Sequence, residues 1–392
     1  MALSKTTSDV MKKIRTQYGD HAISLASEIR KFDIIPSGSL CLDYITGIGG
    51  LPGNRVIEYA GEPGSGKSTL AMHTMNNALK MFPDKIGLFF DLEQKITVDW
   101  MSNFIDDMDR VLILNPDHIE QATDMFKEAV KTGEACVVVL DSIGGSPTKR
   151  TTDKSAEIAN FGGNSIGVGE FVRNAATLGG KYRCQTICIN QIRQDMGGYR
   201  RLITPGGEAL KHACSLRVQL KRGSDKYIEK KPNGEDVQVG YDVVLKIVKS
   251  GIGTPFRATQ YRFYSERSNS GAFGVDRVDE VVRMSRLAEV VEKRGGWYYH
   301  DSLPDGKING EPKLLEHAVQ TPAFVDELER QVRAKIIKGD VIMGISTTFD
   351  EEYADREDDG YLARKLREAE EAVDDLRSMQ EPESPRMPEP GR

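Results

Sequence analysis

The residues best suited to chemistry form a glycine-rich stretch at positions 61–68, which reads Gly-Glu-Pro-Gly-Ser-Gly-Lys-Ser. An apolar run precedes it and a helix-forming run follows, so we expect a strand, a tight turn and a helix in that order. Glycines let the backbone curl until successive N–H groups point at a phosphate chain, and the helix start adds its positive dipole. In this setting Lys67 reaches the β- and γ-phosphates and the Ser68 hydroxyl holds Mg²⁺. The stretch predicts a nucleoside triphosphate site, and an ordinary glycine-rich turn is the alternative.

Three acidic residues at predicted strand ends could supply the carboxylates that hydrolysis of a γ-phosphate requires. Hydrolysis needs an in-line water and a carboxylate that orients or deprotonates it. Glu93, which we expect one strand over from the glycine-rich turn, is the candidate, and a capping or salt-bridging acid is the alternative. Asp141 closes an apolar run and is the candidate for holding Mg²⁺ through water beside Ser68. Asp91 could contribute to the same site.

Gln191 ends a further predicted strand and leads into residues 192–207, which carry four glycines, three arginines and little regular pattern. A loop that starts at a γ-phosphate and carries arginines could couple the nucleotide state to a bound polyanion. Arginine contacts to phosphates would make such binding depend on salt. A plain surface loop is the alternative.

These residues require a scaffold in which strands and helices alternate. Apolar strands are expected at 55–60, 86–90, 111–114, 136–141 and 186–191, and helices at 117–131 and 166–178. Such alternation predicts a parallel sheet covered on both faces, with ligands beyond the carboxyl ends of the strands. Longer strands follow at 216–221, 237–250 and 257–264, with a polar, hairpin-type excursion at 223–234 and a smaller α+β unit at 271–343.

Composition indicates a soluble globular protein, since 29% of the 392 residues are charged and 39% are hydrophobic. The sequence has neither a membrane-spanning run nor the apolar core of a signal peptide, which predicts a cytoplasmic protein. Residues 350–392 carry a net charge of −8 against −6 for the whole chain. Such a tail could compete with nucleic acid for a basic groove or merely aid solubility. We expect buried, reduced thiols at Cys41, Cys136, Cys184, Cys188 and Cys214.

Taken together, several stretches resemble the bacterial-type RecA recombinases, in a bacterial or phage-encoded form. The most specific is Asn-Gln-Ile-Arg at 190–193, followed by Gly-Gly-Glu-Ala-Leu-Lys at 206–211. The resemblance implies a RecA-type P-loop ATPase core with a mostly parallel central sheet, an N-terminal helix and a small C-terminal α+β domain. The implied divisions are an N-terminal polymerisation segment at 1–35, the core with its DNA-binding loops at 36–268, the small domain at 269–345 and an acidic tail at 346–392. Further supporting stretches lie at 37–43, 49–52, 61–68, 91–93, 138–142 and 296–299.

The resemblance also implies an activity. It indicates a DNA-dependent ATPase that forms a helical filament on single-stranded DNA, pairs it with homologous duplex DNA and exchanges strands in recombination and repair. ATP and Mg²⁺ are the implied cofactors, and single-strand-binding and loader proteins are further expected partners, with no membrane involved. Two alternatives stay open: a RecA-fold helicase that translocates on DNA, and an ATP-gated DNA-binding filament without strand exchange.

Site residues follow from the same resemblance. Glu93 resembles the catalytic glutamate, Gln191 the sensor of the γ-phosphate, and Trp100 the aromatic residue that stacks on adenine, with a buried core tryptophan as the alternative. Lys249 matches one of two lysines that reach the neighbouring subunit's ATP, and Gly251 replaces the second. Catalysis is assigned to Glu93, Lys67 and Gln191, and Mg²⁺ binding to Ser68 and Asp141. The implied nucleotide contacts are Gly61, Glu62, Pro63, Gly64, Ser65, Gly66, Lys67, Ser68, Thr69, Trp100, Asp141 and Lys249.

For DNA, the resemblance implies two loops, at 150–167 and at 192–206. The first is longer and richer in glycine than the family pattern. The N-terminal helix resembles a polymerisation element that docks on an adjacent subunit, although an amphipathic helix can equally pack on its own body. The residues implied to contact DNA are Arg173, Arg193, Met196, Arg200, Arg201, Gly206 and Gly207.

Overall fold

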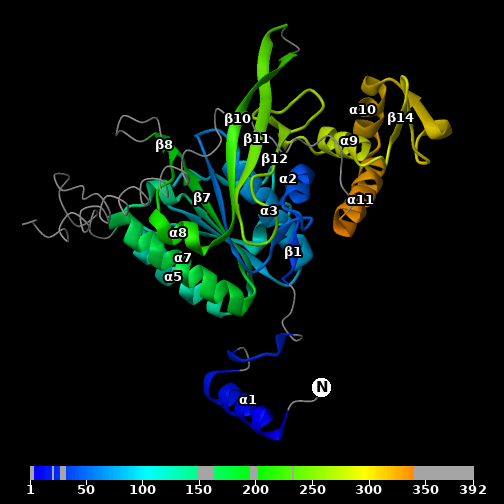
Figure 1. Cartoon of the computed structure of the whole chain (residues 1–392). Coiled ribbons are helices and arrows are strands. Elements are labelled where there is room, and N and C mark those ends of the chain that lie inside the picture. The colour runs from blue at the N-terminus through cyan, green and yellow to red at the C-terminus, as the bar shows by residue number, and fades with distance from the viewer. Residues whose placement is uncertain are drawn as a thin grey trace, which may run out of the picture. The chain divides into compact units, whose positions relative to one another are not determined.

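A computed structural model describes residues 4–19, 22–26, 32–148, 163–194, 202–231 and 234–339 of the chain. Nine strands of the described residues form one sheet: β3 (Val56–Gly61), β4 (Ile86–Asp91), β5 (Val111–Leu114), β6 (Ala135–Asp141), β7 (Gln185–Gln191), β10 (Cys214–Lys230), β11 (Asp236–Ser250), β12 (Ala258–Tyr264) and β13 (Gly274–Val275). Their order is β13-β12-β11-β10-β3-β7-β6-β4-β5 (Figure 1). The strands from β10 to β5 run parallel, whereas β11, β12 and β13 are antiparallel to their neighbours. The predicted α/β fold with a mostly parallel central sheet is confirmed.

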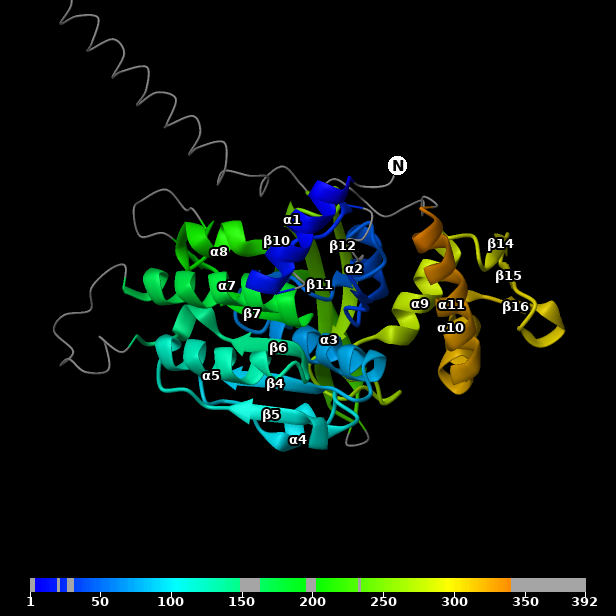
Figure 2. The same cartoon turned by 90° about the horizontal axis from the view of Figure 1, so that it is seen from below.

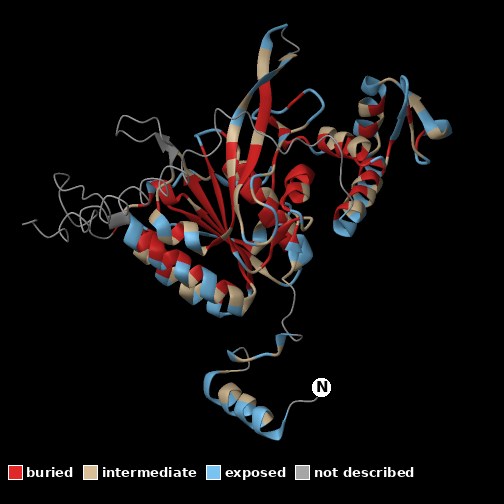
Figure 3. Ribbon diagram, viewed as in Figure 1, coloured by how far each residue is buried: buried red, intermediate tan, exposed pale blue. Residues whose placement is uncertain are grey.

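Both faces of the parallel strands are buried, which explains their continuous apolar sequences. Alternate residues of β6 belong to different cores, because side chains along a strand point to opposite faces. Val137 and Val139 pack in the core that includes residues of α3 (Lys67–Met81). Val138 and Leu140 pack in the other core, with residues of α5 (Ile119–Lys131) and α7 (Gly163–Tyr182). Figure 2 shows α5 and α7 side by side, and Figure 3 shows the strands as the most continuously buried part of the fold.

The polar stretch at 223–234 lies in a hairpin, as its sequence predicts, but the strands are longer than expected. β10 continues past Lys221 to Lys230 and pairs there with Asp236. Pairing between β10 and β3 ends at Leu220, so the rest of the hairpin extends past β3. Aromatic contacts support this extension: the Arg222 guanidinium lies 3.9 Å from the centre of the Tyr241 ring. Tertiary contacts of this kind overcome the low strand preference of the polar residues.

A three-helix unit with a small antiparallel sheet follows the large sheet. Its elements are α9 (Arg277–Leu287), β14 (Glu292–Arg294), β15 (Trp297–Tyr299), β16 (Lys307–Asn309), α10 (Glu311–Gln320) and α11 (Pro322–Lys338). Apolar residues of its helices form a third core with Leu40 and Cys41 of α2 (Leu40–Ile45). The buried Glu280 carboxylate accepts hydrogen bonds from the Ser39 hydroxyl and from the backbone N–H of Leu40 and of Cys41.

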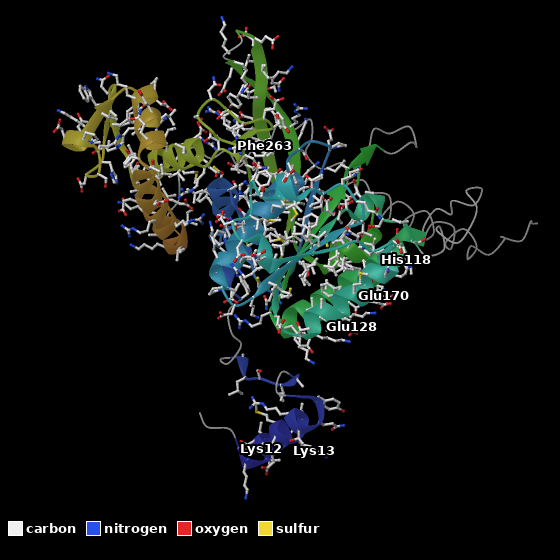
Figure 4. The ribbon with its side chains drawn as sticks, turned by 180° about the vertical axis from the view of Figure 1, so that it is seen from behind. Lys12, Lys13, His118, Glu128, Glu170 and Phe263 are labelled. Atoms are coloured by element: carbon white, nitrogen blue, oxygen red, sulfur yellow. The ribbon has the colours of Figure 1, made fainter. Side chains whose placement is uncertain are left out.

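The remaining α-helices and strands among the described residues are short or terminal. They are α1 (Lys5–Tyr18), β1 (Ile34–Ile35), β2 (Leu51–Pro52), α4 (Val98–Met101), β8 (Arg193–Gln194), β9 (Leu202–Ile203) and α8 (Gly207–Ala213). In α1 no residue is buried, and Lys12 and Lys13 extend from it (Figure 4). All five cysteines are buried and free, as predicted. Within the described ranges, none of the helices is both long and apolar enough to cross a bilayer. The tail at 346–392 and most of the predicted first DNA loop lie outside the described residues.

Candidate nucleotide-binding site

The glycine-rich stretch joins the end of β3 to the start of α3, which is the predicted strand, turn and helix. Gly64 and Gly66 have φ angles of 72° and 83°, a left-handed backbone that favours glycine. At Gly66 a Cβ atom would also lie 3.2 Å from the ring of Phe263 on β12. Gly66 caps α3 without a side-chain hydrogen bond, so the first N–H groups of the helix face the loop. Such a helix start suits an anion.

Lys67 lies at the centre of this loop. Its Nζ donates hydrogen bonds to the carbonyl oxygens of Gly61, at 2.9 Å, and Glu62, at 2.7 Å. Burial lowers the pKa of the ammonium group, although the nearby carboxylates of Asp141, Glu93 and Glu62 oppose the shift. A cation held by the loop that curls around it is placed to meet a polyphosphate.

Ser68 and Asp141 form an oxygen pair beside the loop. The Ser68 hydroxyl donates to Asp141 Oδ2 at 2.6 Å, which brings the start of α3 to the end of β6. Burial raises the pKa of Asp141 to about 6, against the effect of the Ser68 hydrogen bond. A hydroxyl and a carboxylate in this arrangement are the oxygen ligands that Mg²⁺ prefers.

Glu93 and Gln191 meet at the same edge of the sheet. Gln191 Nε2 donates to Glu93 Oε1 at 2.9 Å, and the Ser142 hydroxyl donates to the same oxygen. Lys95 Nζ donates to Glu93 Oε2. Burial acts to raise the pKa of Glu93, but the hydrogen bonds from Lys95, Ser142 and Gln191 prevail and lower it. The carboxylate therefore stays ionised at neutral pH, as a group that positions water must.

The expected position of Glu93 one strand over from the loop is wrong. β7 and β6 both lie between β3 and β4, so the chain enters the sheet at β3 and crosses two positions before forming β4. Glu93 nevertheless reaches the site because it follows β4 in a loop, where it approaches Gly145. A Cβ atom at Gly145 would lie 3.1 Å from Glu93 Oε1.

A cavity of about 490 Å³ collects these groups. Asp91 also lines it, and its Oδ2 accepts a hydrogen bond of 2.9 Å from the Ile96 N–H. Trp100 lines the cavity too and packs edge-on against Phe104, with ring centres 5.3 Å apart, so it is partly core and partly wall. The full lining is Pro63, Gly64, Lys67, Ser68, Asp91, Glu93, Lys95, Ile96, Thr97, Trp100, Asp141, Ser142, Ile189 and Gln191.

Sequence reasoning missed three polar residues of this cavity, which are Lys95, Thr97 and Ser142. Ser142 directly follows Asp141 at a strand end, so the same rule that selected Asp141 could have found it. Lys95 carries no sequence signal, because nothing in the pattern around it indicates that it pairs with Glu93.

Other predicted residues lie away from the cavity lining. Lys249 Nζ donates to the carbonyl oxygens of Lys211, at 2.5 Å, and His212, at 3.1 Å, near the end of α8. Arg173 is exposed on α7, whereas Thr69 is buried in the first turn of α3. Gly206 and Gly207, with positive φ angles, begin α8. The side chains of Arg193, Met196, Arg200 and Arg201 lie outside the described residues.

The sheet, the glycine-rich loop and the polar groups at the strand ends define the chain as a P-loop nucleotide-binding protein of the α/β class. The RecA N-terminal domain family matches residues 5–268. The chain therefore belongs to the RecA family, as the sequence motifs predicted.

Curated relatives extend this similarity over most of the chain. Protein RecA of Thermotoga petrophila is 29% identical over 334 residues, which cover 83% of this chain and 90% of that protein. Protein RecA of Roseiflexus castenholzii is 29% identical over 367 residues, covering 89% of this chain and 97% of the relative. Protein RecA of Roseiflexus sp. strain RS-1 is 30% identical, with 85% and 93% covered.

Proposed function

We propose that the chain is a RecA-type recombinase, an ATPase that assembles on single-stranded DNA and exchanges strands with homologous duplex DNA. The observation that carries the proposal is the hydrogen bond between Gln191 and Glu93. Gln191 is the last residue of β7, and the segment 192–206 that carries three arginines starts directly after it. A residue at a strand tip that contacts the catalytic candidate can bias the segment that it begins.

The nucleotide chemistry follows from the cavity. Lys67 and the first N–H groups of α3 stabilise the negative charge of the β- and γ-phosphates. Ser68 and Asp141 would hold Mg²⁺, which would neutralise part of the phosphate charge. Glu93 orients the attacking water, because its lowered pKa keeps the carboxylate ionised and able to accept a hydrogen bond from that water. Trp100 offers an aromatic face to the adenine ring.

DNA binding and assembly complete the proposal. Salt-dependent contacts to DNA phosphates are assigned to Arg173, Arg193, Arg200 and Arg201, with Met196, Gly206 and Gly207 in the same surface. Lys249 reaches toward the ATP of a neighbouring subunit within a helical filament. The proposal keeps the divisions at 1–35, 36–268, 269–345 and 346–392, a cytoplasmic location, and single-strand-binding and loader proteins as partners.

Two assays test the proposal together. ATP hydrolysis is measured with and without single-stranded DNA, and strand exchange is measured with homologous and with unrelated duplex DNA. We expect hydrolysis to rise with DNA and exchange to occur only with the homologous duplex. Unwinding of a forked duplex without homologous pairing would indicate a helicase, and DNA binding without turnover would indicate an ATP-gated binding protein.

A further inference from the structure

A buried charged group lies next to the nucleotide site and belongs to none of the assigned functions. Glu58 sits in the middle of β3 with no exposed surface. Its Oε2 accepts a hydrogen bond from Arg217 Nε on the neighbouring β10, where the two residues are register partners. Its Oε1 accepts a hydrogen bond of 2.7 Å from Asn190 Nδ2 on β7. The carboxylate thus joins the two strands on either side of β3.

Both hydrogen-bond partners of Glu58 also donate hydrogen bonds to the same short stretch of chain. Asn190 Nδ2 also donates to the carbonyl oxygen of Pro205 at 2.8 Å, and Arg217 Nη2 donates to the Thr204 hydroxyl at 3.1 Å. Thr204 and Pro205 are the last residues before Gly206, which caps α8. They therefore lie at the C-terminal end of segment 192–206, and Gln191 immediately precedes its N-terminal end.

The two ends of this segment are consequently tied to adjacent residues. Gln191 precedes the N-terminal end and contacts Glu93, while its neighbour Asn190 contacts Pro205 at the C-terminal end. The Gln191 N–H also donates to Asn190 Oδ1 at 3.0 Å, which fixes the amide orientation of that side chain. Both described ends of the segment are therefore held at the tip of β7.

The network is poorly explained as a source of stability alone. Burying a carboxylate and a guanidinium carries a desolvation penalty that the ion pair often only balances, and apolar residues of similar volume can be equally stable there. What the charged groups add is direction, because a planar guanidinium and an amide fix several oxygen atoms at defined angles. Here those oxygens belong to the end of a loop.

We propose that Asn190, Glu58 and Arg217 are positioning residues that hold Thr204 and Pro205, the described end of the segment that we propose binds DNA. This inference rests on the proposed function, in which that segment binds DNA and Gln191 responds to the γ-phosphate. Glu58 accepts hydrogen bonds from both Arg217 and Asn190, and none of the three residues is among those that line the cavity.

Two substitutions separate positioning from general stability. Thr204→Val removes the hydroxyl that Arg217 holds without leaving the Glu58 charge unpaired, and Thr204→Ser restores that hydroxyl. Arg217→Lys keeps a cation beside Glu58 but lacks the second donor that reaches Thr204. Thr132→Val is the matched control, because the Thr132 hydroxyl contacts only the end of α5 and the turn that follows.

The measurements are the half-saturating concentration of single-stranded DNA, the ratio of DNA-stimulated to basal ATP hydrolysis, and the affinity for a fluorescent ATP analogue. For Thr204→Val and Arg217→Lys we expect the half-saturating concentration to rise by ~5-fold or more and the ratio to fall, in the usual range of coupling between sites. Thr204→Ser should recover the wild-type values, Thr132→Val should keep them, and Arg217→Lys should keep the affinity for the analogue.

The outcomes separate the two proposals. If the wild-type protein shows no stimulation by DNA, the proposed function fails. If the wild type is stimulated and both variants match it in half-saturation and ratio, the positioning network is wrong while the function stands. A loss of ATP-analogue affinity in Arg217→Lys equal to its loss of DNA affinity would also overturn the inference, since it would indicate general damage to the fold.

Discussion

Gln191 Nε2 and Glu93 Oε1 lie 2.9 Å apart and join residues that are 98 positions apart in the chain. The bond crosses β6, which separates β7 from β4 in the sheet. It is one of three side-chain hydrogen bonds to the Glu93 carboxylate, and together these outweigh the effect of burial on its pKa. The Gln191 amide therefore contacts the same carboxylate that we propose orients the attacking water.

Replacing Glu93 by glutamine tests the role of this carboxylate. Glu93→Gln keeps the size of the side chain but removes the negative charge. That charge would orient the attacking water and accept its proton, so we expect ATP turnover to fall by about 10²-fold or more. Affinity for ATP and ATP-dependent DNA binding should persist. Steady-state hydrolysis and DNA-binding titrations measure the two effects, and hydrolysis at the wild-type rate would contradict the assignment.

Removing the Lys67 ammonium should impair nucleotide binding itself, before hydrolysis can take place. In Lys67→Ala the loop loses the cation that Gly61 and Glu62 hold in place, so the charge of the β- and γ-phosphates is no longer balanced. We expect nucleotide-dependent DNA binding to be abolished. Lys85→Ala is the matched control, because the Lys85 ammonium donates to the Gly133 carbonyl oxygen instead. Nucleotide-dependent DNA binding of Lys67→Ala at the wild-type level would exclude this role.

Much of the site could be predicted from strand ends alone. Asp141 and Gln191 each close an apolar run, and carboxyl ends of parallel strands meet at one edge, so their proximity needed no knowledge of strand order. The strand order itself could not be predicted, because β7 comes after β6 in the sequence but lies between β3 and β6 in the sheet. That insertion is why Glu93 lies farther across the sheet than expected.

The roles of residues that depend on tertiary contacts could not be predicted from the sequence. Glu58 interrupts an otherwise apolar strand, which indicates a buried polar contact. The pattern does not indicate that Arg217 and Asn190 both donate hydrogen bonds to its carboxylate. The continuation of β10 past Arg222 likewise depends on the Tyr241 ring of the partner strand. A polar strand segment is indistinguishable from a loop until its partner is known.

Two glycines of the phosphate loop should differ in their tolerance of a side chain. Gly64→Ala and Gly66→Ala both place alanine in a left-handed backbone, at a cost of about 1–2 kcal/mol each in the free energy of unfolding. Only Gly66 has a neighbour within 4 Å of the new atom, the Phe263 ring at 3.2 Å, whereas nothing lies near Gly64. We expect Gly66→Ala to be the less stable variant in urea unfolding. Equal midpoints would mean that Phe263 yields without strain.

Acid stability should depend on His73, whose ring packs edge-on against Phe104 at 5.2 Å between ring centres. Its Nε2 is buried without a hydrogen-bond partner among the described residues. Burial, with a smaller contribution from Lys80, lowers the pKa of His73 to about 4 from its ordinary value of 6.5. The unfolded chain therefore binds more protons between these values, so the contribution is complete above about pH 6.5 and is lost as the pH falls toward 4.

The size of this effect follows from the two pKa values. At about pH 5 the linkage relation gives a loss of about 2 kcal/mol in the free energy of unfolding relative to pH 7.5. His73→Leu cannot bind the proton, so its free energy of unfolding should fall by about 2 kcal/mol less than that of the wild type over this interval. The side chain of His212 is 82% exposed, which makes His212→Leu the matched control with a wild-type profile. Urea unfolding at both pH values measures the difference, and parallel profiles for His73→Leu and the wild type would show that His73 does not set acid stability.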